Sequence, residues 1–408
     1  MKNALNTPQA NGITRRDGLM LSLLGSALTL AGCGGGGGGA DSGGVASVSS
    51  GGTGSFSSGP ITGFGSIIVG GIRFDDSTAS AIVDIDDDNK DLRNQLKLGM
   101  LVRVKGKAKN GSRADADSIE VRSELLGPID SINASASPNT LVVLGQTVLI
   151  TATTVFDEGL SFPALLVNDI VEVHGFVDAA TNRLTATRVE RKDATKVKAF
   201  KLQGLVKGLG TATQTLQIGS LGISFASSVN TPASLVLAND LLVRVRLATT
   251  PATGTRTALK IQIVKAEVED RDEVEIEGTI TVFGSGGKFS VNAQPVDASK
   301  ASIPAGLKLG DRVEVEGSLV NGVLLAKSVK LDDEKDTLKF ELHGTLASLN
   351  LTLKTFVLRG VTVDFSGTVD LRDGILATLA NIGLKAIQVN GVLSADGTRL
   401  KASRISFE

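Results

Sequence analysis

One short motif, a glycine followed by apolar residues in alternation, recurs five times along the chain and constrains its fold more than any other feature. The intervals between successive copies are 68, 77, 74 and 66 residues, and the copies begin at Gly59, Gly127, Gly204, Gly278 and Gly344. A second landmark follows each copy in the same order, an alternating apolar run such as Val313-Glu314-Val315-Glu316-Gly317. Two landmarks recurring in one order indicate tandem copies of a single small unit.

The landmarks divide most of the chain into five repeats, of which the third diverges. Repeat 3 has Leu247 where the other four copies close the second landmark with glycine, and a polar loop at residues 248–257 follows. The predicted domains are repeat 1 (59–124), repeat 2 (125–196), repeat 3 (197–270), repeat 4 (271–336) and repeat 5 (337–408).

Each repeat shows the period of two that is typical of short strands, with five strands in about 70 residues. In repeat 5 these strands are 340–346, 355–358, 361–365, 386–393 and 399–407, and the long connection at 371–382 has room for one turn or a short helix. We therefore predict an all-β tandem array of five small five-stranded Greek-key barrels of the oligonucleotide/oligosaccharide-binding type. Units of this size bury little core, so neighbouring repeats are expected to stack.

The amino terminus has the pattern of an export signal. Arg15 and Arg16 precede thirteen uncharged residues, 19–31, a helix too short to span a hydrocarbon core, which predicts a signal peptide over residues 1–32. The run ends in Leu-Ala-Gly-Cys at Cys33, which resembles the lipobox of bacterial lipoproteins, and the arginine pair resembles the twin-arginine export motif. The resemblance implies a lipid on Cys33, attachment to a bacterial membrane and, because residue 34 is Gly rather than Asp, the outer membrane.

A glycine-rich segment follows the expected lipid attachment site. Of residues 34–59, 12 are glycine and most of the others are Ser, Ala or Val. The loss of conformational entropy on ordering such a chain costs more free energy than burial of its few apolar side chains would contribute. We expect residues 33–58 to be a flexible tether with a mean reach of about 28 Å.

The repeat sequences resemble a known but uncharacterised family. The opening Gly-Pro-Ile-Thr-Gly-Phe-Gly-Ser-Ile at 59–67 and the Leu-x-x-Gly-x-x-Val-x-Val-x-Gly block resemble a bacterial domain of unknown function that occurs as tandem repeats in exported lipoproteins. The resemblance covers residues 60–408, with repeats 1, 2, 4 and 5 close to the pattern and repeat 3 departing from it. The family implies an architecture and no activity.

Composition excludes several classes of function. One Cys and two His rule out a disulfide framework and a zinc cluster built from those residues. His174 and His343 lie at polar steps of alternating strands, which predicts solvated side chains rather than catalytic bases. The chain has neither Trp nor Tyr, and its net charge after loss of residues 1–32 is −3, so nucleic acid is not an expected partner. The Phe residues near the end of the third strand (Phe74, Phe225 and Phe365) are predicted to be core.

Carboxylates that alternate in an acidic stretch of repeat 1 are the best candidate for a metal site. Asp84, Asp86 and Asp88 offer the oxygen ligands that Ca²⁺ prefers. The stretch lacks the sixth-position glycine and distal Glu of a helical calcium loop, and a solvated acidic loop is the favoured explanation for it. No other cofactor is expected. The charged segments between repeats, such as Arg191-Lys192-Asp193, are predicted to be solvated linkers.

These observations favour a non-enzymatic, lipid-anchored envelope protein. Its barrels are expected to act as a binding or spacer array for an envelope protein or glycan, with the membrane contacted through the lipid on Cys33. The alternative is a calcium-dependent module or an enzyme that uses the acidic loop of repeat 1.

Overall fold

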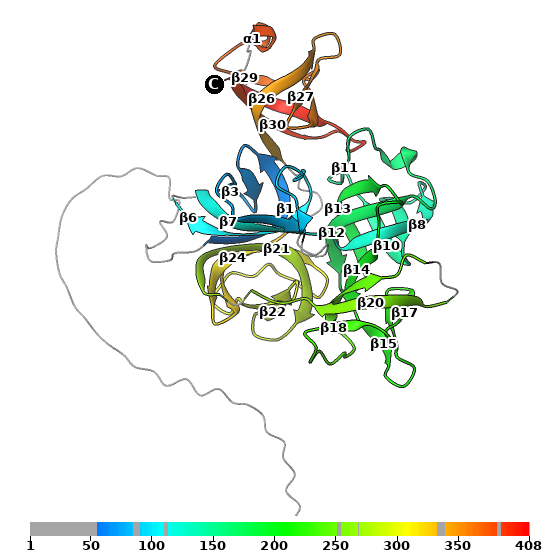
Figure 1. Cartoon of the computed structure of the whole chain (residues 1–408). Coiled ribbons are helices and arrows are strands. Elements are labelled where there is room, and N and C mark those ends of the chain that lie inside the picture. Colours follow the sequence, from blue (N-terminus) through cyan, green and yellow to red (C-terminus); the bar gives the residue numbers. More distant parts are fainter. Residues whose placement is uncertain are drawn as a thin grey trace, which may run out of the picture. The chain divides into compact units, whose positions relative to one another are not determined.

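The computed structural model describes residues 55–84, 90–109, 113–250, 254–267, 269–332, 339–381 and 385–407 (Figure 1). The expected signal peptide with Arg15 and Arg16, the lipidation site Cys33 and most of the expected tether lie outside the described residues. Nearly all regular structure in the described part is β-strand, which confirms the all-β prediction. None of the helices in this part is long and apolar enough to cross a membrane.

The strands fall into the five repeats that the sequence predicts. Repeat 1 contains β1 (Ser55–Phe64), β2 (Ile67–Val69), β3 (Ile72–Asp75), β4 (Ala81–Asp84), β5 (Lys90–Asp91), β6 (Leu101–Ala108) and β7 (Arg113–Arg122). Repeat 2 contains β8 (Leu125–Asn133), β9 (Asn139–Val143), β10 (Gln146–Ile150), β11 (Val155–Phe156), the 3-10 helix η1 (Phe162–Ala164), β12 (Ile170–Asp178) and β13 (Arg183–Lys192). Repeat 3 contains β14 (Phe200–Leu205), β15 (Lys207–Gly210), β16 (Thr215–Ile218), β17 (Leu221–Ser224), β18 (Val229–Thr231), β19 (Leu242–Leu247) and β20 (Arg256–Ile263).

The last two repeats follow the same plan. Repeat 4 contains β21 (Arg271–Phe283), β22 (Lys288–Val291), β23 (Gln294–Asp297), β24 (Arg312–Val320) and β25 (Val323–Leu331). Repeat 5 contains β26 (Phe340–Asn350), β27 (Thr355–Leu358), β28 (Val361–Asp364), β29 (Asp370–Arg372), α1 (Leu376–Asn381), β30 (Ala386–Leu393) and β31 (Leu400–Phe407). The short helix α1 lies in the connection for which the sequence leaves room.

Strand pairing closes each repeat into a small barrel. In repeat 4, β21 pairs antiparallel with β22 and β24, β22 pairs antiparallel with β23, and β24 pairs antiparallel with β25. The ring closes where β23 pairs parallel with β25. The other four repeats have the same five pairings, with the first strand of repeat 3 interrupted between β14 and β15. Tandem five-stranded barrels are therefore confirmed.

One further pairing in the repeats is not anticipated by the five-strand pattern. A short strand in the third-to-fourth connection (β4, β11, β18 and β29) pairs parallel with the last strand of its own barrel. Repeat 4 has a single bridge there, Ser302 to Ser328. These strands have at most four residues, too short for a reliable period-two signal.

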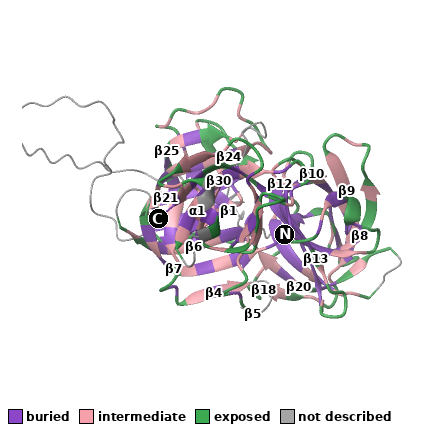
Figure 2. Ribbon diagram, turned by 90° about the horizontal axis from the view of Figure 1, so that it is seen from above, coloured by how far each residue is buried: buried purple, intermediate pink, exposed green. Residues whose placement is uncertain are grey.

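The apolar residues of the second landmark are buried in the barrel cores, and Figure 2 colours each residue by its burial. Val313 and Val315 of β24 are fully buried, while Glu314 and Glu316, which alternate with them, point to the other face, as the alternation of a strand requires. The third-strand aromatics are also core as predicted: Phe74 and Phe365 are buried and Phe225 packs against the core of repeats 2 and 3.

The glycine that ends the second landmark has a specific backbone role. At Gly106, Gly175, Gly317 and Gly391 the pairing of the fourth strand with the fifth shifts register, as in a β-bulge. A Cβ on Gly391 would clash with the backbone carbonyl oxygen of Lys401, and the other three positions meet an equivalent carbonyl. Close backbone approach at the bulge therefore explains why the glycine recurs.

The predicted boundary between tether and repeat 1 is wrong by four residues. The first strand, β1, begins at Ser55, and its residues Ser55–Ser58 pair on one side with β6 and on the other, in parallel, with β21 of repeat 4. Phe56 is 1% exposed and belongs to the core of repeat 4. A buried aromatic and two ladders of backbone hydrogen bonds outweigh the low strand propensity of this Ser-rich segment.

Repeats pack against their neighbours in sequence and also against repeats that are distant in sequence. β8 of repeat 2 pairs antiparallel with β14 of repeat 3, as expected of adjacent units. In addition, β1 of repeat 1 pairs with β21 of repeat 4 and, at Gly63 and Phe64, with β26 of repeat 5. Repeat 1 therefore shares one strand with two barrels that are distant in sequence.

Candidate functional site

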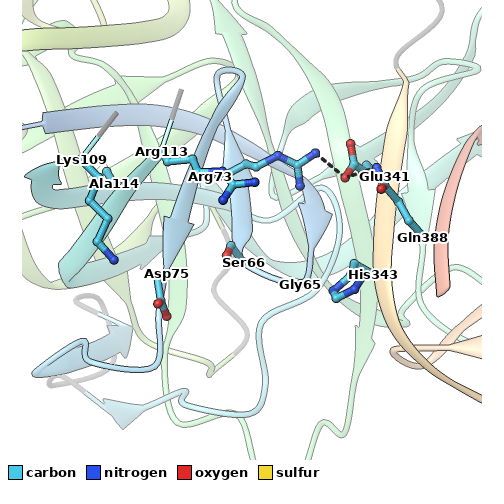
Figure 3. A pocket seen from close by; sticks show the side chains of 10 residues that line it. All are labelled: Gly65, Ser66, Arg73, Asp75, Lys109, Arg113, Ala114, Glu341, His343 and Gln388. Atoms are coloured by element: carbon cyan, nitrogen blue, oxygen red, sulfur yellow. Dashed lines mark hydrogen bonds and ion pairs between the residues drawn. The ribbon is translucent and has the colours of Figure 1, made fainter. Parts of the chain in front are cut away.

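A polar pocket with a volume of about 380 Å³ lies where repeat 1 meets repeat 5 (Figure 3). Repeat 1 contributes the β1–β2 turn, β3 and the ends of β6 and β7, and repeat 5 contributes the polar faces of β26 and β30. The lining residues are Gly65, Ser66, Arg73, Asp75, Lys109, Arg113, Ala114, Glu341, His343 and Gln388.

Glu341 is fixed on the repeat 5 side of the pocket. Its carboxylate forms an ion pair with Arg73 and accepts a hydrogen bond of 2.8 Å from Nε2 of Gln388. Glu341 and His343 point outward from β26 because Leu342 between them is fully buried. The Arg73 ion pair joins the two repeats across the pocket.

Strand register groups the charges on the repeat 1 side. β3 pairs parallel with β7, which places Arg73 beside Arg113 and Asp75 beside Asp115. Asp115 forms an ion pair with Lys109, and this contact raises the pKa of Lys109. Hydrogen bonds from the hydroxyl and backbone N–H of Ser77 lower the pKa of Asp75.

Arg113 lines the pocket with hydrogen-bond donors that no described residue uses. Among the described residues, none forms an ion pair or side-chain hydrogen bond with its guanidinium. Its five N–H donors are therefore available to a carboxylate, phosphate or hydroxyl group entering the pocket.

The two histidines differ from each other in environment. His174 is 2% exposed, so the prediction of a solvated side chain is wrong for it: the outward face of β12 packs against repeat 1. Its Nδ1 lies 2.7 Å from the carbonyl oxygen of Arg122, and burial lowers its pKa. His343, in contrast, lines the pocket between repeats 1 and 5.

Only one of the three aspartates predicted to bind calcium is described. Asp84 ends β4, and its Oδ2 lies 2.9 Å from Nζ of Lys201 in repeat 3. Both side chains are largely buried, so Asp84 already has a cationic partner. Asp86 and Asp88 lie outside the described residues, and the calcium loop stays a prediction.

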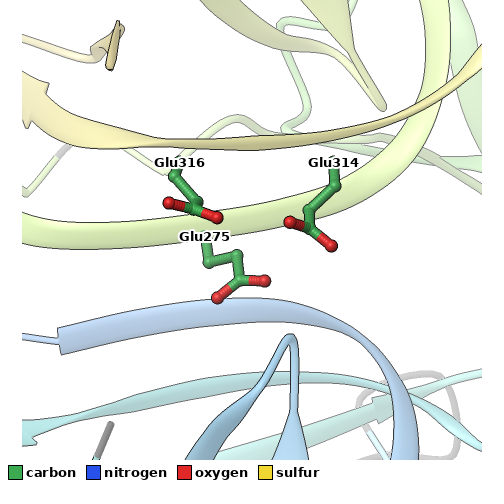
Figure 4. Close-up of side chains that lie close together, drawn as sticks. All are labelled: Glu275, Glu314 and Glu316. Atoms are coloured by element: carbon green, nitrogen blue, oxygen red, sulfur yellow. The ribbon is translucent and has the colours of Figure 1, made fainter. Parts of the chain in front are cut away.

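A second group of carboxylates, not predicted from the sequence, lies on the outer face of repeat 4 (Figure 4). One oxygen of each of Glu275, Glu314 and Glu316 can be chosen so that all lie within 4.8 Å of one another. Nζ of Lys330 lies 2.6 Å from Glu314 and 2.7 Å from Glu316. Burial first, and then the negative charge of Glu314 and Glu316, raises the pKa of Glu275 to about 9.

Charged side chains are buried near the end of β13, just before and within the predicted linker Arg191-Lys192-Asp193. Glu190 is 4% exposed, and its carboxylate lies 2.5 Å from Nε of Arg188 and 2.7 Å from Nζ of Lys192. Arg188 also donates to the carbonyl oxygen of Leu98 in repeat 1. Arg191 and Asp193 of the predicted linker are exposed, but Arg191 and Lys192 belong to the end of β13, and Lys192 pairs with the buried Glu190.

The fold and these sites define a tandem array of small β-barrels with polar joints. Three segments, residues 58–120, 127–190 and 272–330, match a domain of unknown function, DUF5666. The matches support a chain built from tandem copies of that domain. Repeat 3 lies outside them, in line with its divergence, and repeat 5 also lies outside them although its strands pair in the same order. No curated protein matches the chain.

Proposed function

We propose that this chain is an exported, lipid-anchored, non-enzymatic protein of the bacterial envelope whose barrels form a spacer and binding platform. The position of β1 carries the proposal. A tether leading from a lipid on Cys33 would enter the folded body at Ser55, in the strand that repeat 1 shares with repeats 4 and 5. Tension on the anchor would then be distributed over three barrels, which suits a spacer.

The pocket between repeats 1 and 5 is the proposed contact for an envelope protein or glycan. Its volume of about 380 Å³ is within the range of small-ligand sites, and its lining is polar and of mixed charge. Hydroxyl and carboxylate groups match the donors of Arg113 and Gln388. The absence of Trp and Tyr and the mature charge of −3 argue against nucleic acid.

The anchor is tested by Cys33→Ser, followed by membrane fractionation and metabolic labelling with a fatty acid. We expect the parent protein to take up label and to fractionate with the outer membrane, and the variant to lose both properties. Retention of both by Cys33→Ser would exclude this anchor. Arg15→Lys with Arg16→Lys tests the export route, with accumulation of the precursor as the expected result.

The binding role is tested by photo-crosslinking in cells. A photoreactive residue replaces Arg113 in the pocket or, as a control, Val236 of repeat 3, which is 82% exposed. We expect a discrete adduct from position 113 only, and only in the anchored protein. Equal capture from both positions contradicts the pocket as the contact, and no capture at position 113 leaves a spacer without this contact.

A further inference from the structure

A small cavity lies at the joint of repeats 1, 2, 3 and 4. Its volume is about 40 Å³, and residues of all four repeats line it. A single water molecule needs about 10–15 Å³ of such space, so the cavity has room for a small ion but not for a sugar or a phosphate ester. Its basic lining residues are Arg103, Arg122 and Arg244, and its acidic ones are Glu124 and Glu277.

Strand geometry directs the three arginines out of their barrels and into this joint. The pairing of β6 with β7 places Arg103 opposite Glu120, and Arg122 lies two residues beyond Glu120 on the same face. The valines next to the arginines are buried in the barrel cores: Val102, Val104, Val121, Val243 and Val245. Because side chains alternate along a strand, Arg103, Arg122 and Arg244 point to the opposite, outer face.

Arg103 has no carboxylate partner within the described part of the chain. Its one hydrogen bond there runs from Nη1 to the carbonyl oxygen of Lys265, at 3.1 Å. Burial first, and then the positive charges of Arg122 and Arg244, lower the pKa of Arg103 to about 9, so Arg103 is still a cation at neutral pH. A cation that is removed from water without a counter-charge is costly.

The carboxylates around the cavity already have cationic partners. Glu120 lies 2.7 Å from Arg122, and Glu124 lies 3.7 Å from Arg244. Glu277 forms an ion pair with an arginine of its own repeat that does not line the cavity. These pairs leave the cavity lining with one net positive charge, that of Arg103.

Two neutral side chains add hydrogen-bond donors to the lining. Gln203 of repeat 3 and Asn292 of repeat 4 both border the cavity. Oδ1 of Asn292 accepts a hydrogen bond of 3.2 Å from the backbone N–H of Thr279, which leaves its Nδ2 as a donor. No described residue accepts a hydrogen bond from the side-chain amide of Gln203 or of Asn292. Donors from repeats 1, 3 and 4 therefore surround one small space.

We propose that this cavity binds a small inorganic anion, chloride, between Arg103 and the amides of Gln203 and Asn292. A monovalent anion balances the charge of Arg103 and accepts several N–H bonds at once. A water molecule has the right size, but it leaves the charge of Arg103 uncompensated. The bound ion joins repeats 1, 3 and 4. The site shares no residue with the pocket between repeats 1 and 5, so it does not depend on the proposed function.

The proposal is tested by the melting temperature of the full chain made soluble by Cys33→Ser, in mixtures of NaCl and sodium gluconate at constant ionic strength. Charge screening is the same in all mixtures, and gluconate is too large for the cavity. Because a ligand of the folded state stabilises it, we expect a rise of about 2–4 °C that saturates as chloride replaces gluconate. Equal melting temperatures in all mixtures overturn the proposal.

Two substitutions in the same chain locate the ion. Arg103→Gln removes the unbalanced charge and is expected to abolish the chloride-dependent rise, whereas Arg183→Gln, at an exposed position of repeat 2, leaves it unchanged. Gln203→Glu supplies a carboxylate from the chain itself and is expected to raise the melting temperature in gluconate and to remove the response to chloride. If Arg103→Gln fails to fold, Gln203→Glu decides. An unchanged response to chloride in either folded variant overturns the proposal.

Discussion

At the residue scale, the buried ion pairs of β13 in repeat 2, where Arg188 also contacts repeat 1, set the response of this joint to acid. Burial alone would raise the pKa of Glu190, but Arg188 and Lys192 outweigh it and hold the pKa at about 2. Because the folded-state pKa is below the ordinary value of 4.5, the stabilisation is complete above pH 4.5 and is lost as the pH falls through about 2.

Glu190→Gln tests this joint by removing one of the two carboxylates that pair with Arg188, the other being Asp157. Because Asp157 still pairs with Arg188, we expect a loss of about 1–3 kcal/mol in the free energy of unfolding at neutral pH, and a shallower loss of stability between pH 4.5 and 2. Urea unfolding at a series of pH values measures both. Glu158→Gln, on an exposed position of the same repeat, is the control, and equal effects of the two changes would contradict the prediction.

Two glycines of repeat 5 test the role of the β-bulge: Gly391 lies at the bulge, and Gly367, which lies in open space, is the control. Gly391→Ala places a methyl group against the carbonyl oxygen of Lys401, whereas a Cβ on Gly367 meets no atom within 4 Å. We expect Gly391→Ala to cost about 1–3 kcal/mol and Gly367→Ala less than about 0.5 kcal/mol in urea unfolding. Faster hydrogen exchange in β30 and β31 should accompany the first change alone.

At the element scale, the alternation of apolar residues predicts most strands. It does not predict that β1 begins at Ser55 or that it pairs with β21 of repeat 4. Residues 51–58 are all Gly, Ser or Thr apart from Phe56, and this composition favours a coil. The single aromatic is the sequence signal that residues 55–58 belong to a strand. Its partner strand β21 is more than 200 residues away, a pairing that local periodicity cannot reveal.

Phe56→Ala tests whether β1 joins repeats 1 and 4. Removal of a ring that is 1% exposed should destabilise repeat 4 by about 3–5 kcal/mol and speed hydrogen exchange in β21. Phe283→Ala, at a position 47% exposed in the β21–β22 hairpin, should have little effect. If exchange in β21 is the same in both variants, β1 does not support repeat 4.

At the scale of the whole molecule, the candidate sites lie where barrels meet, and this limits what the sequence can predict. The grouping of Glu275, Glu314 and Glu316 was not predicted, although the pattern Glu-x-Glu in the first and fourth strands of repeat 4, which the barrel plan places side by side, is a signal that could have indicated it. That pattern does not predict the turn at Gly70 that covers Glu275, nor the approach of Glu341 to Arg73. Both depend on packing between repeats that are not neighbours.

The same packing predicts that repeat 4 depends on repeat 1 for its stability. Its core includes Phe56, and β21 has β1 as a hydrogen-bonding partner along Glu273–Ile276. A unit of about 60 residues is marginal alone. Isolated residues 271–332 should therefore melt at a lower temperature than the full chain, and addition of a peptide spanning residues 55–64 should raise that temperature. The same peptide with Phe56→Ala is the control, and a melt of residues 271–332 as high and as sharp as that of the full chain would show that the repeat is independent.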